Sequence, residues 1–107
     1  MKPIVFLGDS LEAIRDFPSD VRREAGHQLD RVQRGLMPDD WKPLTTLGAG
    51  ISEIRLRDAN GAFRVIYVAK SDKGVCVLHA FQKKTERTAR ADLDLARKRL
   101  RDYRRPA

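Results

Sequence analysis

Residues 51–84 read ISEIRLRDANGAFRVIYVAKSDKGVCVLHAFQKK, and this stretch decides the fold. Ile51 to Arg57 alternates apolar and polar side chains, the pattern of a half-buried strand. Asn60-Gly61 follows, and this pair is the strongest short-range signal of a β-hairpin. Ala62 to Ala69 is rich in β-branched and aromatic residues, as strands prefer. After a polar turn, Val75 to Phe81 is almost wholly apolar, which predicts a third strand inside the sheet.

Three arginines of this stretch fall on one face of the predicted sheet. With Asn60 and Gly61 at the centre of the turn, Arg57 lies opposite Arg64. A four-residue loop instead sets Arg55 opposite Arg64. Both registers put the three arginines on one face, because strand sides alternate. A two-residue turn at Asp72-Lys73 adds three more residues to this face: His79, Phe81 and Lys83.

Like charges placed directly opposite each other destabilise a sheet. Three arginines on one face therefore suggest that an anion normally sits beside them. The alternative is a solvated face that only keeps the protein soluble, and the spacing alone favours neither interpretation.

Length and charge bound the remaining possibilities. The chain has 107 residues, so we expect a single domain over residues 1–107. It carries 22 Lys+Arg against 15 Asp+Glu, a net charge of +7 with a pI near 10.1. Such a balance favours a polyanion or an acidic protein as partner.

Cysteine and histidine are scarce. One cysteine, Cys76, and two separated histidines cannot build a disulfide framework or a metal site. We therefore expect no metal and no cofactor, and a reduced cytoplasmic compartment. The apolar run from Ile4 to Leu7 is far too short for a signal peptide or a membrane span.

The N-terminal half predicts a strand and two helices. Lys2 to Leu7 reads as a strand, and a short helix follows from Asp9 or Ser10 until Pro18 breaks it. Ser19 then caps a longer helix to about Arg34, with an apolar stripe at helical spacing. Leu36 to Gly50 reads as a shaped loop in which Trp41 packs into the core.

The C-terminal segment predicts one more helix, capped by Thr88 and running to about Tyr103. Between Arg87 and Arg105 there are eight Lys+Arg and three Asp, so most of the net charge lies here. The segment either forms an exposed, solubilising helix or contacts the nucleic-acid backbone, with Arg87 and Arg90 as candidate RNA-binding residues.

Several strings resemble a known family. E-I-R-L-R, G-A-F-R-V-I-Y and V-L-H-A-F-Q-K-K-T, followed by the terminal helix, are similar to the RelE/ParE toxin superfamily. D-S-L-E-A-I-R-D-F-P, Q-R-G-L and W-K-P-L resemble its phage-derived HigB-like branch. The resemblance covers nearly the whole chain.

This resemblance implies an α+β fold, with two N-terminal helices packed on a small twisted antiparallel sheet and a C-terminal helix. It implies the toxin of a type II toxin–antitoxin system, and a cognate antitoxin encoded next door, often a helix-turn-helix protein. Members of the superfamily include ribosome-dependent endoribonucleases that cut mRNA, so mRNA on the ribosome is the implied substrate.

The same resemblance implies roles for single residues. Arg55, Arg64 and Lys84 match cationic residues that RelE-type nucleases use on mRNA, and Arg57 and Lys83 flank them. RelE-type enzymes also place a tyrosine early in the last helix, where this chain reads T-E-R-T-A-R. The proton-transfer partner therefore stays unassigned by the resemblance.

The chemistry of RNA cleavage fits this set. Arg55 and Arg64 would stabilise the phosphate, and Lys83 or Lys84 would assist proton transfer. His79 is a candidate base, although a histidine within an apolar strand is more often structural. Phe81 either stacks a base or packs in the core.

Two other functions remain open at this point. A ParE-like toxin would bind gyrase and cut nothing, and it would need no clustered cations at the sheet. A plain nucleic-acid-binding module would use only the basic terminal helix.

Overall fold

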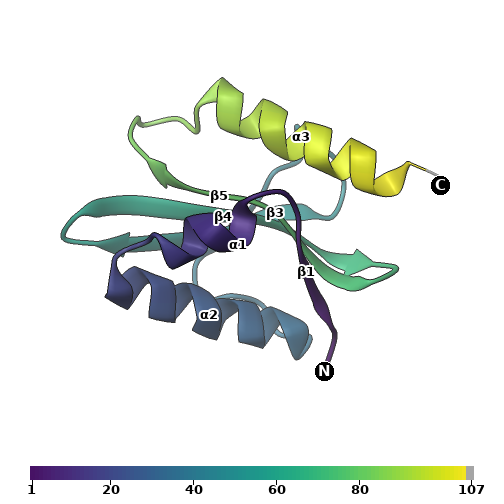
Figure 1. The fold of residues 1–107 in the computed structure, drawn as a ribbon, viewed down its shortest axis with the longest axis horizontal. Coiled ribbons are helices and arrows are strands. Elements are labelled where there is room, and N and C mark those ends of the chain that lie inside the picture. Colours follow the sequence, from purple (N-terminus) through teal and green to yellow (C-terminus); the bar gives the residue numbers. More distant parts are fainter. Residues whose placement is uncertain (106–107) are drawn as a thin grey trace.

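A five-stranded mixed sheet separates two layers of helices in the computed structural model, which describes residues 1–105 (Figure 1). The strand order is β1-β5-β4-β3-β2, and only the β1–β5 pair is parallel. Helices α1 and α2 cover one face and α3 covers the other. The elements are β1 (Ile4–Phe6), α1 (Ser10–Arg15), α2 (Ser19–Gln33), β2 (Trp41–Pro43), β3 (Ile51–Asp58), β4 (Gly61–Ser71), β5 (Gly74–Lys83) and α3 (Arg90–Arg104).

The predicted fold class is wrong in its sheet and in its order of elements. The chain begins with a strand rather than with two helices, and the sheet is not purely antiparallel. β1 lies parallel to β5, with Ile4 opposite Val75 and Phe6 opposite Val77. The apolar run from Lys2 to Leu7 does predict β1. The resemblance to the family did not imply a first strand parallel to β5. Parallel pairing between strands far apart in the chain leaves no local signal in the sequence.

The β3–β4 hairpin uses the second of the two registers that the sequence left open. Arg55 lies opposite Arg64, and Asp58 lies opposite Gly61. The amide of Asn60 donates to the Asp58 carboxylate at 2.7 Å, a local bond typical of Asp in turns. Gly61, at φ 136°, supplies the only left-handed backbone in this turn. The two central residues of the turn are therefore Ala59 and Asn60, one position earlier than the Asn60-Gly61 pair.

The β4–β5 hairpin matches the prediction. Ser71 lies opposite Gly74, which leaves Asp72 and Lys73 as the two-residue turn. Phe81 lies opposite Arg64, so it shares a face with the arginines as expected. Two irregularities within the strand pair shift the register by one residue in opposite directions. Arg64 and Phe81 are therefore paired as they would be in a regular hairpin with this turn.

Helices α2 and α3 lie close to their predicted bounds. The stripe predicted for α2 is buried at every position: Val21, Ala25, Leu29 and Val32. Helix α3 starts at Arg90, two residues after the expected cap at Thr88, and buries Ala96 and Leu100. Within residues 1–105, every helix is too short or too polar to cross a membrane.

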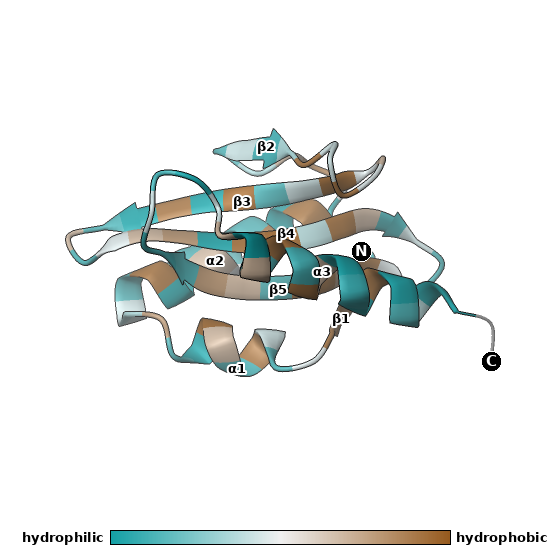
Figure 2. Ribbon diagram, turned by 90° about the horizontal axis from the view of Figure 1, so that it is seen from above, coloured by the Kyte–Doolittle hydropathy of each residue, from teal (hydrophilic) through white to brown (hydrophobic). Residues whose placement is uncertain are grey.

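Two apolar cores lie on opposite sides of the sheet (Figure 2). The larger core joins α1 and α2 to alternate residues of β3 and β4, namely Ile54, Leu56, Phe63, Val65 and Tyr67. The smaller core joins α3 to the opposite face, with Ile66, Leu78, Ala96 and Leu100 among its members. The arginines therefore lie on the side that α3 only partly covers.

Trp41 does not pack into the core as predicted. It lies in β2, a three-residue edge strand that the sequence presented as part of a loop, and it is 39% exposed. Pro38 and Leu44, on either side of β2, are buried instead. An edge strand has only one neighbour to cover its side chains, which leaves the indole open to solvent.

Candidate functional site

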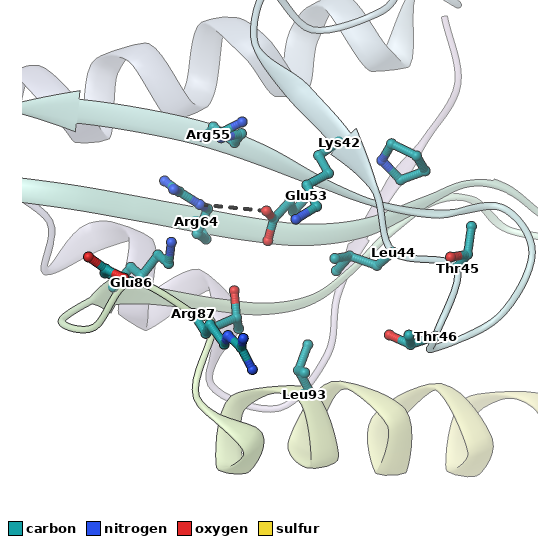
Figure 3. A pocket seen from close by; sticks show the side chains of 13 residues that line it. Lys42, Leu44, Thr45, Thr46, Glu53, Arg55, Arg64, Glu86, Arg87 and Leu93 are labelled. Carbon is teal, nitrogen blue, oxygen red and sulfur yellow. Dashed lines mark ion pairs between the residues drawn. The ribbon is translucent and has the colours of Figure 1, made fainter.

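A charged hollow of about 480 Å³ lies on the α3 side of the sheet. Figure 3 shows it between β3, β4, the β2–β3 loop and the start of α3. We name it the sheet pocket. Five cations face two carboxylates in its lining: Lys42, Arg55, Arg64, Lys83 and Arg87 against Glu53 and Glu86.

A buried ion pair forms the floor of the sheet pocket. The side chains of Arg64 and Glu53 are each only 4% exposed, and Arg64 Nε lies 3.7 Å from Glu53 Oε1. Arg64 Nη1 donates to the carbonyl of Phe63 at 2.9 Å. Arg64 Nε and Glu53 Oε2 have no hydrogen-bond partner among the described residues. An unpaired buried polar group costs about 1–3 kcal/mol, so a polar group that reaches these two atoms is bound favourably.

Burial, together with neighbouring positive charge, lowers the pKa of two of the pocket cations. Burial lowers the pKa of Arg64, with nearby Glu53 opposing the shift. Burial also lowers the pKa of Lys83, and the positive charge of Arg64 adds to the effect. Lys83 is thus a better proton donor than an ordinary lysine, whereas arginine stays charged at any physiological pH.

The structure brings together four of the nine predicted site residues in the sheet pocket and leaves five outside it, three of them exposed and two, His79 and Phe81, buried. Arg55, Arg64, Lys83 and Arg87 all line the sheet pocket. The three exposed residues are not part of its lining: Arg57, Lys84 and Arg90. Arg64 is only 3% exposed and pairs with buried Glu53, so it is not part of a merely solvated sheet face.

His79 and Phe81 share the sheet face of the arginines but lie under α3. His79 Nε2 is 2.7 Å from Asp92 Oδ1, and its ring stacks on Phe81 with the centroids 4.9 Å apart. Both residues are at least nine-tenths buried, and neither lines the sheet pocket. Arg99 approaches His79 Nδ1 at 3.5 Å from the same helix. These contacts attach α3 to β5, which is the structural role that the sequence left open for His79.

Glu53 is the site residue that the sequence analysis missed. It was counted only as a polar member of an alternating strand, although alternation places it on the same face as Arg55. A carboxylate two residues before an arginine on one strand face was the available signal. The role of Glu53 depends on its ion pair with Arg64 from the next strand. This ion pair can be predicted only when the register of the hairpin is known.

Comparison with curated proteins finds no match. The family model described as phage derived protein Gp49-like (DUF891) matches residues 12–101, a span that contains the whole lining of the sheet pocket. This family is associated with toxins of toxin–antitoxin systems. Because the match covers most of the chain, the protein belongs to the family of phage-derived Gp49-like proteins.

Proposed function

We propose that this protein is the toxin of a type II toxin–antitoxin system and that it arrests translation by cleaving mRNA on the ribosome. The observation that carries the proposal is the buried Arg64–Glu53 pair, with a carboxylate set among the cations of the sheet pocket. The association of the family with toxins supports the biological role. The choice of RNA rests on the resemblance of the sequence motifs to RelE-type nucleases and on the cations of the sheet pocket.

The pocket offers a group for each chemical need of RNA cleavage. The Glu53 carboxylate accepts the proton of the 2′-hydroxyl, and the 2′-oxygen then attacks the adjacent phosphorus. Arg55 and Arg64 stabilise the charge that develops on the phosphate oxygens. Lys83 gives a proton to the 5′-oxygen as its bond to phosphorus breaks. The products are a 2′,3′-cyclic phosphate and a free 5′-hydroxyl.

Ribosome dependence follows from the modest reach of this small site. With a volume of about 480 Å³, the sheet pocket has the size of a small-molecule site and holds only a short piece of an RNA strand. Holding the 2′-oxygen in line with the leaving oxygen contributes much of the rate in such reactions. The ribosome supplies this alignment in the proposed mechanism.

We further propose an adjacently encoded helix-turn-helix antitoxin as partner, with both proteins acting in the cytoplasm.

Induced expression in bacteria tests the proposal, with the 5′ ends of cellular RNA mapped soon after induction. New ends should appear within translated reading frames and disappear when initiation is blocked. They should also disappear with Arg55→Ala and Glu53→Gln. Arg57→Ala is the matched control, because Arg57 lies on the same strand as Arg55 but outside the pocket.

A different result would replace the proposal. If growth stops while messages stay intact and DNA supercoiling falls, the protein targets gyrase rather than mRNA. Normal growth with soluble, folded protein present would refute the toxin role itself.

A further inference from the structure

A second cationic hollow lies at the opposite end of α3 from the sheet pocket. Its volume is about 460 Å³, and four cations line it: Lys70, Lys73, Arg104 and Arg105. We name it the hairpin pocket, because the β4–β5 hairpin supplies the two lysines and the end of α3 supplies Arg104. Among the described residues, Asp72 is the only acidic one in its lining.

The side chains around the hairpin pocket are held by defined contacts. Tyr103 Oη lies 3.3 Å from Ser71 Oγ, and this contact fastens the end of α3 to the hairpin. Lys73 Nζ lies 5.8 Å from the centroid of the Tyr103 ring. Buried Val68, Cys76 and Leu100 form the apolar floor. The hollow is thus built from two elements that pack together and is not a single flexible chain end.

The cations of the hairpin pocket differ from the other cations of α3. Within residues 1–105, none of the four forms an ion pair with a carboxylate. The other cations of α3 each lie within 4.0 Å of a carboxylate: Arg90 and Arg97 with Asp94, Lys98 and Arg101 with Asp102, and Arg99 with Asp9. Five cations of α3 therefore share three carboxylates, whereas the four cations of the hairpin pocket have no carboxylate partner within residues 1–105.

We propose that the hairpin pocket is a second RNA-binding site that holds the phosphate backbone and takes no part in cleavage. The choice of RNA rests on the proposed function, since the same protein already presents a phosphate site at the sheet pocket. On α3, Leu93 lines the sheet pocket and Leu100 lines the hairpin pocket, so the two pockets approach within about 10 Å of each other along the helix axis. Single-strand-binding folds commonly cover about 4–16 nucleotides, which is compatible with one RNA contacting both pockets.

Binding of a 2′-O-methylated single-stranded RNA tests the proposal, because this RNA lacks the nucleophile and cannot be cleaved. The full-length protein is titrated by fluorescence anisotropy at several salt concentrations. Lys70→Ala with Lys73→Ala removes two cations of the hairpin pocket. The matched control is Arg97→Ala with Lys98→Ala, which removes the same charge from positions of α3 that already pair with a carboxylate. Circular dichroism checks that both variants are folded.

The two variants should separate clearly. Without its two lysine–phosphate contacts, the hairpin variant should show a slope of log affinity against log salt that is less steep by about 1.4. Its affinity at 0.1 M salt should be about 25-fold weaker than that of the wild type. The control variant should change the affinity by less than about 3-fold. An equal loss in both variants would overturn the proposal, because binding would then depend on overall charge. Binding of an acidic peptide at the hairpin pocket in preference to RNA would overturn it in favour of a protein partner.

Failure of the proposed function gives a different signature. A protein that binds RNA through Lys70 and Lys73 but leaves cellular messages intact would refute the nuclease role and keep the hairpin pocket as an RNA site. Conversely, the hairpin variant should still cleave mRNA when overproduced, because the sheet pocket is unchanged.

Discussion

Arg64→Ala should destabilise the protein strongly, contrary to what an exposed arginine on a sheet face would predict. The substitution leaves the Glu53 carboxylate with 4% of its side chain exposed and without its cationic partner. At 3.7 Å and an effective dielectric constant of 20, the lost attraction is about 4.5 kcal/mol. Measured losses from breaking one half of a buried pair are about 3–5 kcal/mol. We take about 3 kcal/mol, because the pair borders a hollow that water can enter.

Thermal and urea denaturation measure this loss. About 3 kcal/mol corresponds to a fall in Tm of roughly 12 °C for a domain of this size. The double variant Arg64→Met with Glu53→Leu should recover most of the stability, because replacing both partners by apolar groups is often neutral. An Arg64→Ala protein that unfolds within about 0.5 kcal/mol of wild type would show that the arginine is solvated, and the reasoning would fail.

Four further results are expected. Glu53→Gln should bind uncleavable RNA more tightly, by about tenfold if one repulsive charge costs 1.4 kcal/mol, while losing cleavage; weaker binding would contradict the assigned geometry. Lys83→Arg should keep RNA affinity but lose cleavage, and wild-type cleavage should fall as pH rises through the lowered pKa of Lys83, below the ordinary 10.5. Trp41→Ala should cost about 1 kcal/mol in chemical denaturation, well under the 3–5 kcal/mol of a core aromatic residue. Asp92→Ala removes the partner of His79, so hydrogen exchange in α3 should accelerate; unchanged exchange would show that the His79–Asp92 contact does not hold α3 on the sheet.

Local patterns predicted the elements, and long-range pairing limited the prediction of how they assemble. The strands from Ile51 onward and the stripe of α2 depend on side chains a few residues apart, where alternation and helical period act directly. The parallel pairing of β1 with β5 joins residues about 70 positions apart in the chain. β2 has three residues and ends in Pro43, too little for a period of two to show. Its exposed Trp41 was assigned to the core on hydrophobicity alone.

The candidate site was predicted only in part, because it too depends on contacts between residues that are far apart in the chain. The face shared by Arg55 and Arg64 follows from alternation in either register. The burial of Arg64 does not follow from alternation. It depends on Glu53 and on other segments of the chain that line the sheet pocket. Family likeness likewise grouped Lys84 with the site. The structure ends β5 at Lys83 and leaves Lys84 outside the pocket.

The carboxylate of Glu53 is the feature that separates a cleavage site from a simple anion trap. A pocket of cations alone would bind the ground-state phosphate tightly, and tight ground-state binding does not accelerate a reaction. Glu53 weakens that binding, because its charge opposes the phosphate and already attracts Arg64. In the proposed reaction the 2′-hydroxyl proton passes to Glu53 and removes this charge. Arg64 is then free to stabilise the phosphate at the moment when negative charge on its oxygens is greatest, so the buried pair favours the transition state over the bound substrate.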